Sequence, residues 1–463
     1  MSLAHQFYGR LVYPLLDADQ RGLSRRLRQL RAWETLSPEA ARQRQWQALR
    51  SLLRHAYNTC PFYRARFDMA GVHPDAIQEP QDMERIPPLT RQDLRAHGLE
   101  MQSRTVPAAT LRPAASGGTT DLPVPLWRDP ETIRARYAVQ IAMRAWAGWR
   151  PGDKSFLLWG ARSDFPAQPS WRWRLFQRHV LREVFAPGSL LNQEIMEQFR
   201  LRLNAFRPQA IVAYPSALAL WSEFLLHSGR NYFRPPSLLV TAEALLPQQR
   251  QVIELAFDRP VFEHYGSREF GIIASQCEAQ TGMHLHPAAA WLDTPLVAGA
   301  GGLREMLVTD LIGYGFPLIR YRINDCVQGE PATGCACGRP FPLLPPLVGR
   351  SADIFYLPDG TAIPGVTFTG RILKVCPQIL QMQLIQETPR EFRFRYVAGP
   401  DFAAGGLQAI EAGIAAFFPP GLHWTLEAVA EIPREANGKT RFAISKVPAG
   451  ASPAARSTPP SGA

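Results

Sequence analysis

The sequence predicts an α/β protein with a large N-terminal body and a small α+β domain at the C-terminal end. Two patterns carry this prediction. From about residue 105 to 348, short apolar runs alternate with helical patterns, which is typical of a sheet covered by helices. After residue 348, strand-like runs dominate. Apolar residues make up 46% of the 463 residues and charged residues 20%, which is the composition of an ordinary globular chain.

Residues 1–104 are expected to form the helical start of the large body. Ser37-Pro38-Glu39 predicts a helix start, because serine caps well, proline fits the first helical position and an acid suits the first turn. An apolar stripe follows at helical spacing and comprises Trp46, Leu49, Leu53 and Ala56.

Residues 105–348 are expected to form the α/β core. Its predicted strands lie at Ser155–Trp159, Ala210–Ala213, 237–240 and 260–262, and a helix is predicted over Pro247–Phe257. The small domain, 349–446, has predicted strands at 355–358, 380–386, 391–397 and 424–430 and helices near 365–376 and 405–418. Residues 447–463 are small, proline-rich and unpatterned, which predicts a disordered tail.

The formal net charge of +11 comes mainly from two arginine-rich stretches, 1–60 and 171–182. Arginine is the default cation of the chain, whose lysines are Lys154, Lys374, Lys439 and Lys446. Helical apolar spacing in both stretches and the lack of a nucleic-acid-binding motif argue against a nucleic-acid partner. Trp171 and Trp173, which lie among arginines, leave peripheral contact with a membrane surface as an alternative.

The chain is expected in the cytoplasm, peripheral to a membrane at most. No apolar run approaches the roughly 18 to 20 residues of a membrane-spanning helix, and the first residues lack the basic start and apolar core of a secretory signal. In the cytoplasm the six cysteines are expected as thiols or metal ligands and not as disulfides. The oligomeric state is left open, with a dimer as one alternative.

Three stretches of the core carry candidate chemistry. The loop Ser116-Gly117-Gly118-Thr119-Thr120 offers backbone N–H groups and hydroxyls to phosphate oxygens, although it is not a Walker A motif; the alternative is a flexible surface loop. The run 263–271 (EHYGSREFG) follows a predicted strand, so its carboxylate could hold Mg²⁺ and its aromatic ring could stack on a base. The alternative there is an ordinary strand-to-helix turn.

The third stretch is 308–311 (VTDL) followed by 317–325 (PLIRYRIND). Alternation puts Ile319, Tyr321, Ile323 and Asp325 on one face of a strand. Asp325 is therefore expected at the end of the strand, where it could accept hydrogen bonds from a sugar diol or serve as a cap. Beyond it, 349–353 (GRSAD) marks a natural hinge, and 433–441 (PREANGKTR) places Lys439 on an expected mobile loop.

Taken together, these stretches resemble the adenylate-forming, acyl-CoA synthetase-like superfamily, and more closely its phenylacetate–CoA ligase and capsule-biosynthesis branch. Residues 265–269 (YGSRE) are similar to that family's Tyr-Gly-x-Thr-Glu box, and PLIRYRIND is similar to its Pro-Leu-Ile-Arg-Tyr-Arg-x-x-Asp strand. Gly349-Arg350 resembles the hinge motif and Gly438-Lys439 the catalytic-lysine motif. The resemblance covers roughly 100–445 and implies a large adenylate-forming N-terminal domain with a small mobile C-terminal domain.

The resemblance implies a role for each matched position. The ATP phosphates would be held by Ser116, Gly117, Gly118, Thr119 and Thr120. Thr241-Ala242-Glu243 and Tyr265 would frame the adenine, Gly266 would also bind the cofactor, and Asp325 with Arg350 would hold the ribose. Glu269 would bind Mg²⁺, Lys439 would bridge the substrate carboxylate and the α-phosphate, and the small domain would pivot near Asp353. The acid would lie against Tyr214, Pro215 and Ser216.

Two departures from the family pattern stand out. The phosphate loop usually continues Thr-Gly-Lys-Pro, but here 120–123 reads Thr-Asp-Leu-Pro, so a cation near the triphosphate is missing. Arg268 replaces the hydroxyl residue before the metal-binding Glu269. Arg268 is a candidate for the lost charge at the α-phosphate; the alternative is altered chemistry.

A separate set of residues suits a metal ion. Cys277, His284, Cys335 and Cys337 offer three thiolates and one imidazole, the ligand types of structural Zn²⁺. His286 is the rival imidazole, and buried free thiols are the alternative. Some members of the phenylacetate–CoA ligase branch carry a similar zinc arrangement.

The resemblance implies ATP-dependent activation of a small carboxylic acid as an acyl-adenylate, with ATP, AMP, Mg²⁺ and coenzyme A as cofactors. Transfer to coenzyme A is the leading hypothesis for the second step. The alternative is an amine, hydroxyl or carrier-thiol acceptor in polysaccharide or secondary metabolism. A non-enzymatic homologue that binds nucleic acid or membranes is the distant alternative.

Overall fold

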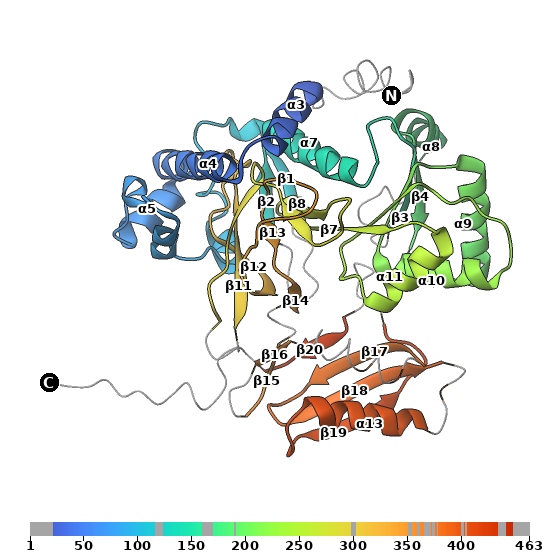
Figure 1. Ribbon diagram of the computed structural model, residues 1–463. Coiled ribbons are helices and arrows are strands. Elements are labelled where there is room, and N and C mark those ends of the chain that lie inside the picture. Colours follow the sequence, from blue (N-terminus) through green and yellow to red (C-terminus); the bar gives the residue numbers. More distant parts are fainter. Residues whose placement is uncertain are drawn as a thin grey trace. The chain divides into compact units, whose positions relative to one another are not determined.

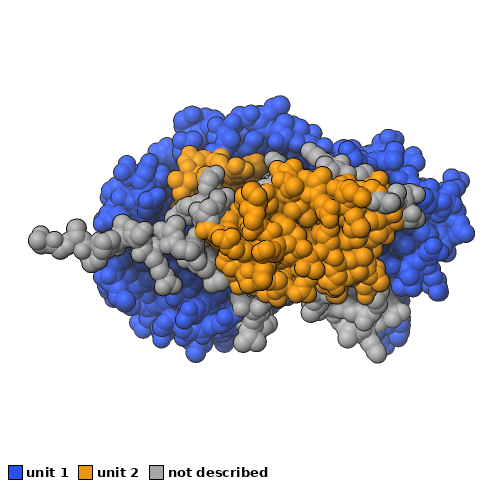
Figure 2. All heavy atoms as spheres, turned by 90° about the horizontal axis from the view of Figure 1, so that it is seen from below, with its two compact units in different colours: residues 1–293, 307–322, 331–344 blue, residues 294–306, 323–330, 345–463 orange. Residues whose placement is uncertain are grey.

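The computed structural model describes residues 22–115, 124–159, 170–188, 191–297, 302–350, 354–358, 362–364, 372, 376, 378–399, 402, 405–433 and 441–447. The chain divides into two compact units (Figure 2). Unit 1 comprises residues 1–293, 307–322 and 331–344, and unit 2 comprises residues 294–306, 323–330 and 345–463. The expected boundaries after 104, 348 and 446 stay predictions, and nearly all of the expected tail lies outside the described residues.

The first described part of unit 1 is helical, as expected. Its α-helices are α3 (Leu23–Glu34), α4 (Pro38–Thr59), α5 (Pro61–Met69) and α6 (Arg91–His97), with 3-10 turns η3 (Pro74–Ala76), η4 (Pro80–Arg85) and η5 (Ala108–Thr110). Helix α4 begins at the predicted cap, where the Ala40 N–H donates to the Ser37 hydroxyl at 3.2 Å. Leu49, Leu53 and Ala56 of the predicted stripe are fully buried, so the stripe is the core face of this helix.

An eight-stranded sheet with the order β13-β9-β8-β7-β6-β5-β3-β4 forms the centre of unit 1 (Figure 1). Its strands are β3 (Ser155–Trp159), β4 (Glu183–Pro187), β5 (Ala210–Ala213), β6 (Ser237–Thr241), β7 (Val261–Ser267), β8 (Gly271–Gln276), β9 (Met283–Leu285) and β13 (Leu343–Leu344). The five strands from β4 to β7 run parallel, and β8, β9 and β13 extend the sheet antiparallel. All four strands predicted for the core are therefore present.

Helices cover both faces of this sheet, which explains why the central parallel strands β3, β5 and β6 are mainly apolar. They are α7 (Pro130–Trp146), α8 (Trp171–Phe176) with the π-helix η7 (Gln177–Leu181), α9 (Gln193–Phe206), α10 (Pro215–His227) and α11 (Pro247–Phe257), which has the predicted bounds. Strand β5 alternates between two cores: Ile211 packs with residues of α9, α10 and α11, and Val212 packs with residues of α3 and α7. Among the described residues, no helix is both long and apolar enough to cross a membrane.

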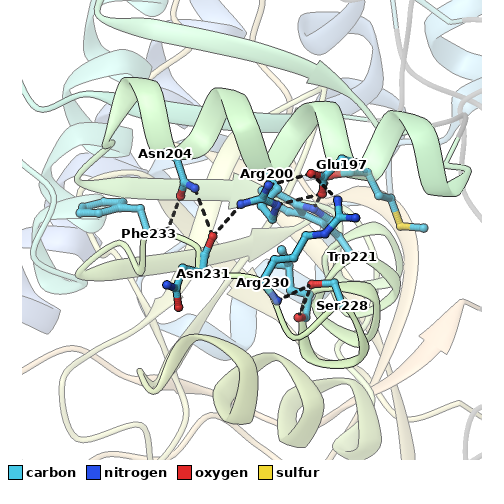
Figure 3. A network of polar contacts seen from close by, with 10 residues as sticks. Glu197, Arg200, Asn204, Trp221, Ser228, Arg230, Asn231 and Phe233 are labelled. Carbon is cyan, nitrogen blue, oxygen red and sulfur yellow. Dashed lines mark hydrogen bonds and ion pairs between the residues drawn. The ribbon is translucent and has the colours of Figure 1, made fainter.

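A polar network fixes α9 to the segment that follows α10 (Figure 3). Glu197 accepts hydrogen bonds from Arg200 at 2.7 and 2.8 Å and pairs with Arg230 at 2.7 Å. Arg200 and Asn204 both donate to the carbonyl oxygen of Asn231, at 2.7 and 3.2 Å. The hydrogen bonds that Glu197 accepts from Arg200, and then from Arg230, lower the pKa of Glu197 to about 2. The network therefore joins α9 to the segment after α10 through charged and polar groups that lie outside the apolar core.

Two smaller sheets are also present. Strands β1 (Arg112–Ala115) and β2 (Pro125–Arg128) pair antiparallel, and β10 (Ala290–Asp293), β11 (Leu303–Asp310), β12 (Tyr321–Gln328) and β14 (Leu347–Arg350) form a sheet in that order. The prediction that Asp325 ends its strand is wrong, because Cys326 and Val327 continue the pairing with β14. Asn324 has a φ of 66°, so the strand is kinked where simple alternation was assumed.

Unit 2 contains the predicted small α+β fold. Its strands are β15 (Ile354–Tyr356), β16 (Ala362–Pro364), β17 (Ile379–Gln386), β18 (Glu391–Ala398), β19 (His423–Ala428) and β20 (Ala443–Ser445), and its helix is α13 (Gly405–Phe417). Four of these strands form a sheet with the order β19-β18-β17-β20. Phe355, Phe394 and Ile410 are fully buried in the core between this sheet and α13. The helix predicted near 365–376 lies mostly outside the described residues.

Candidate active site and metal centre

The run 263–271 lies where β7 turns into β8. Tyr265 and Gly266 were expected to follow the strand, but β7 continues to Ser267 and both residues pair with β8. A Cβ on Gly266 would lie 2.1 Å from the carbonyl oxygen of Gly271, so only glycine fits this crossing. Arg268 and Glu269 consequently lie in the tight turn between the two strands.

Glu269 is a buried carboxylate, with 5% of its surface exposed. The hydroxyl of Tyr321, at the start of β12, donates to its Oε1 at 3.4 Å. Burial and then the charge of Glu269 raise the pKa of Tyr321, which keeps this hydroxyl protonated as a donor. A buried carboxylate at a strand end, held by a neutral donor, is chemically suited to a divalent cation because hard cations prefer oxygen ligands.

Two arginines that sequence reasoning missed lie in this neighbourhood. Arg128 at the end of β2 donates a hydrogen bond to the carbonyl oxygen of Arg268, next to Glu269. Arg136 on α7 forms an ion pair with the buried Asp310 at the end of β11. Burial and then the charge of Arg136 lower the pKa of Arg128 to about 10. Nothing in the sequence singled out these two, because nearly every cation of the chain is arginine.

Glu243, one of the expected adenine residues, meets the expected acid residues at the ends of β5 and β6. Glu243 Oε2 accepts a hydrogen bond from the backbone N–H of Ser216 at 3.2 Å. Tyr214 and Pro215 begin α10, and the Tyr214 ring contacts Trp159 with ring centroids 5.0 Å apart. Ala242 has a φ of 75°, a conformation that costs a non-glycine residue on the order of 1–2 kcal/mol. Such strain at a strand end is typical of functional sites.

The two residues expected at the ribose lie opposite each other. Asp325 on β12 and Arg350 on β14 are direct partners in the antiparallel ladder. The sequence predicted their association only through the family resemblance, since 25 positions of chain separate them and neither belongs to a common local pattern.

Three groups of expected site residues lie outside the described part of the chain. They are the phosphate loop Ser116, Gly117, Gly118, Thr119 and Thr120, the hinge residue Asp353, and the catalytic candidate Lys439. Their roles stay predictions.

The four expected metal ligands come together in unit 1. One ligand atom from each of Cys277, His284, Cys335 and Cys337 lies within 4.8 Å of all the others. The sulfurs of Cys277 and Cys335 are 3.6 Å apart, and the sulfur of Cys337 lies 3.3 Å from His284 Nε2. Tetrahedral Zn²⁺ with ordinary bond lengths needs sulfur–sulfur distances of about 3.8 Å, so the donor set fits this ion.

The imidazole of His284 is oriented for this role. Its Nδ1 donates to the Phe341 carbonyl oxygen at 3.0 Å, which leaves an unprotonated Nε2 facing the thiols. The rival, His286, is fully buried and stacks on Trp146 outside the cluster. Burial raises the pKa of Cys277. Burial also acts to raise the pKa of Cys335, but hydrogen bonds from the Cys337 N–H and from Thr281 outweigh burial and lower the pKa of Cys335.

Known proteins resemble this chain in sequence and in fold. No protein-family model matches the chain. The phenylacetate–coenzyme A ligase of Escherichia coli (strain K12) is 29% identical over 346 residues, which covers 72% of this chain and 76% of that enzyme. The phenylacetate–coenzyme A ligase of Pseudomonas putida is 27% identical over 345 residues, which covers 72% of this chain and 75% of the enzyme.

Among solved structures, 2-hydroxyisobutyryl-CoA ligase in the postadenylation state, in complex with R3-HIB-AMP, superposes with a TM-score of 0.70 at 18% identity. It covers 89% of this chain and 91% of its own. The architecture expected from the resemblance is thereby confirmed. The sequence relatives and the shared fold agree: the chain is similar to phenylacetate–CoA ligases in sequence and shares the fold of an acyl-CoA ligase, which supports the adenylate-forming superfamily and its phenylacetate–CoA ligase-like branch.

Proposed function

We propose that this protein is an AMP-forming ligase that joins a small carboxylic acid to coenzyme A at the expense of ATP. The observation that carries the proposal is the buried carboxylate of Glu269, placed beside Tyr321 at the end of β7 in a chain related to phenylacetate–coenzyme A ligases. In the first step a carboxylate oxygen attacks the α-phosphorus of ATP and pyrophosphate leaves. In the second step the thiol sulfur of coenzyme A attacks the acyl carbon, AMP leaves and the thiol proton is released.

The first step brings anions together, so its barrier is chiefly charge repulsion and positioning. Glu269 is the proposed ligand of Mg²⁺, which supplies positive charge to the phosphates when bound. Lys439 is the proposed mobile cation between the acid and the α-phosphate; a lysine suits a group that must enter and leave a site, because its charge is compact and its stem flexible. Asp353 is the proposed hinge that moves Lys439 away before thiol transfer.

The remaining roles concern binding. We assign the phosphates to the loop 116–120, the adenine to Glu243, Tyr265 and Gly266, and the ribose to Asp325 and Arg350. The backbone pairing of the last two across β12 and β14 supports this assignment. Tyr214, Pro215 and Ser216 are the proposed wall of the acid pocket, and the hydrogen bond from Ser216 to Glu243 links that wall to the adenine residues.

Pyrophosphate release is the measurement that tests the proposal. Purified protein is incubated with Mg·ATP and a panel of aryl, short-chain and long-chain acids, each with and without coenzyme A. We expect pyrophosphate release that depends on the acid, and AMP and acyl-CoA that appear only with coenzyme A. Pyrophosphate without acyl-CoA would exclude coenzyme A as the acceptor and favour an amine, hydroxyl or carrier thiol. No acid-dependent pyrophosphate from the whole panel would contradict an adenylating enzyme.

A matched pair of variants connects the activity to the site. Glu269→Gln removes the proposed metal ligand and is expected to lower acid-dependent pyrophosphate release at least about tenfold. Asp258→Asn removes a carboxylate from an exposed helix end on the same unit, where the side chain is 80% exposed, and is expected to leave the rate unchanged. Equal rates for both variants would contradict the role assigned to Glu269.

We also propose that Cys277, His284, Cys335 and Cys337 hold a structural Zn²⁺. All four positions of a tetrahedral ion are then filled by protein, so the ion stabilises the fold and takes no part in the chemistry. The spacing of the four donor atoms and the fixed tautomer of His284 support this assignment.

Exposed tryptophan, leucine and arginine side chains in the stretch 171–178 support peripheral association with membranes. Trp171 and Leu175 are one helical turn apart on α8 and are 67% and 48% exposed, and the neighbouring Arg172 and Arg178 are exposed as well. Apolar side chains beside cations suit an anionic lipid surface. Flotation with vesicles that contain anionic lipid is expected to recover wild type but not Trp171→Ala/Leu175→Ala. Equal recovery would contradict this contact.

A further inference from the structure

The proposed adenylation needs positive charge at the ATP phosphates, and the phosphate loop does not supply it. Where the family pattern has lysine, residues 120–123 read Thr-Asp-Leu-Pro. The triphosphate of ATP carries several negative charges, and enzymes that transfer its phosphorus place cations around them. Another part of the chain must therefore provide the missing cation.

Arg128 lies close to the proposed metal ligand Glu269. It ends β2, a few residues after the loop, and one of its amino groups donates to the carbonyl oxygen of Arg268, the residue before Glu269. Its Nε is buried and has no hydrogen-bond partner among the described residues. The guanidinium is thus fixed at one end beside the proposed metal ligand, and it keeps a donor for something else.

Arg136 is a second cation of the same kind. Helix α7 follows β2 directly and is capped by Asp129, whose carboxylate accepts from the Thr132 N–H at 2.8 Å. The Arg136 side chain is 12% exposed and pairs through Nη2 with Asp310, which is 2% exposed. Its stem passes the β7–β8 turn, since a Cβ on Gly271 would lie 3.9 Å from it. In the described part of the chain, its Nε and Nη1 have no partner.

Three buried guanidinium nitrogens in this neighbourhood have no acceptor within the described part of the chain, whereas buried donors in proteins are usually paired. A buried, unpartnered Nε also occurs at other described arginines, such as Arg50 and Arg66, but among the described arginines a buried, unpartnered Nη is found only at Arg136. The charged groups that act most strongly on Arg128 point the same way. Arg136 and Arg268 are cations, Glu269 and Asp310 are carboxylates, and with Arg128 itself one positive charge is in surplus. Two buried cations close together disfavour each other unless an anion lies between them. The unpaired donors and the surplus charge therefore both call for an anion at this position.

We propose that Arg128 and Arg136 form a two-arginine cradle for the β- and γ-phosphates of ATP and replace the lysine that the phosphate loop lacks. Arg128 contacts the phosphates, and Arg136, whose Nη2 is held by Asp310, offers its Nε and Nη1 to them as well. Arginine is suited to this exchange, because its planar fork binds phosphate oxygens in pairs and stays charged in a buried site. The proposal rests on the proposed function, since it concerns the ATP of that reaction.

Direct binding to the full-length chain tests the cradle. Titration calorimetry with Mg·ATP, Mg·pyrophosphate and AMP is compared for wild type, Arg128→Gln, Arg136→Lys and Arg134→Gln. Arg136→Lys keeps the ion pair with Asp310, so that the helix stays anchored, but it loses the fork. Arg134 is the control: it lies on the same helix and, within the described part of the chain, pairs with Glu131 at 3.2 Å.

We expect Arg128→Gln to weaken ATP and pyrophosphate binding at least about tenfold, Arg136→Lys to weaken both by a smaller factor, and AMP binding to stay within about twofold. Wild-type affinity of the first two variants for pyrophosphate would overturn the cradle. An equal loss of affinity for AMP would also overturn the cradle, because it would indicate a general structural effect. Melting curves of each variant detect such an effect. If wild type releases pyrophosphate with an acid but the variants show either of these two contradicting results, the cradle is wrong and the proposed function is retained. If wild type binds neither ATP nor pyrophosphate, both fail.

Discussion

Removing the metal from the four-ligand cluster is expected to lower the stability of unit 1 by an amount that the chain connectivity sets. The cluster joins His284 to Cys337, which are 53 residues apart, so a bound ion closes a long loop. By the loop-entropy relation used for disulfides, a cross-link of this length constrains the unfolded chain by about 4 kcal/mol. Spread over a body of roughly 300 residues, this corresponds to a fall in melting temperature of about 6 °C at most.

The assay is thermal unfolding with and without a strong chelator, together with metal analysis of the untreated protein. Cys337→Ser removes one ligand and is expected to abolish the chelator-dependent shift. Cys376→Ser, a buried thiol of unit 2 outside the cluster, is expected to retain it. Less than half an equivalent of zinc per chain, or melting temperatures that agree within about 1 °C with and without chelator, would refute a structural zinc site.

Three further predictions concern other parts of the chain. Lys439→Ala should lower the adenylation rate at least about tenfold, or about 1.4 kcal/mol, measured as acid-dependent pyrophosphate release; an unchanged rate would remove Lys439 from the mechanism. Phe257→Ala deletes a fully buried ring and should cost about 3–5 kcal/mol in denaturant unfolding, and a loss below about 1 kcal/mol would contradict the packing described for α11. The pKa of Glu197, depressed to about 2, makes its ion pairs stabilising above the unfolded value of roughly 4.3; wild type and Glu197→Gln should therefore differ most above pH 5 and converge as the pH falls toward 2, and a constant difference would contradict the pairing with Arg200 and Arg230.

The parallel part of the large sheet was predictable because its strands are buried on both faces. Runs such as Ala210–Ala213 are continuous apolar stretches between helical patterns, and periodicity detects them directly. The antiparallel extension was not predictable, since β9 and β13 are three and two residues long and carry no pattern of their own. The end of β7 was missed for a related reason: its last residues are held by β8, a partner that the local sequence does not reveal.

The convergence of Cys277, His284, Cys335 and Cys337 was predictable because cysteine and histidine are rare enough for their spacing to be informative. Asp325 was assigned to a strand end because alternation was carried through Asn324, whose left-handed backbone breaks it. Arg128 and Arg136 were missed because a residue type that supplies most of the charge carries little information at any one position. Only the burial of their nitrogens, which depends on tertiary packing, separates them from the arginines on the surface.

The four-ligand cluster lies at the margin of the large sheet, and this position affects how readily the protein self-associates when the cluster opens. His284 lies on β9, and Leu343 of the two-residue strand β13 pairs with it, so the last hydrogen-bonding edge beyond β9 is covered by a very short segment. Cys335 and Cys337 anchor the turn that leads into this segment. Opening the cluster would free β13 and leave β9 as an unprotected edge, which is a template for pairing with another chain. Self-association on storage or under thiol oxidation is therefore expected to precede loss of the nucleotide site, and light scattering would register damage before an activity assay does.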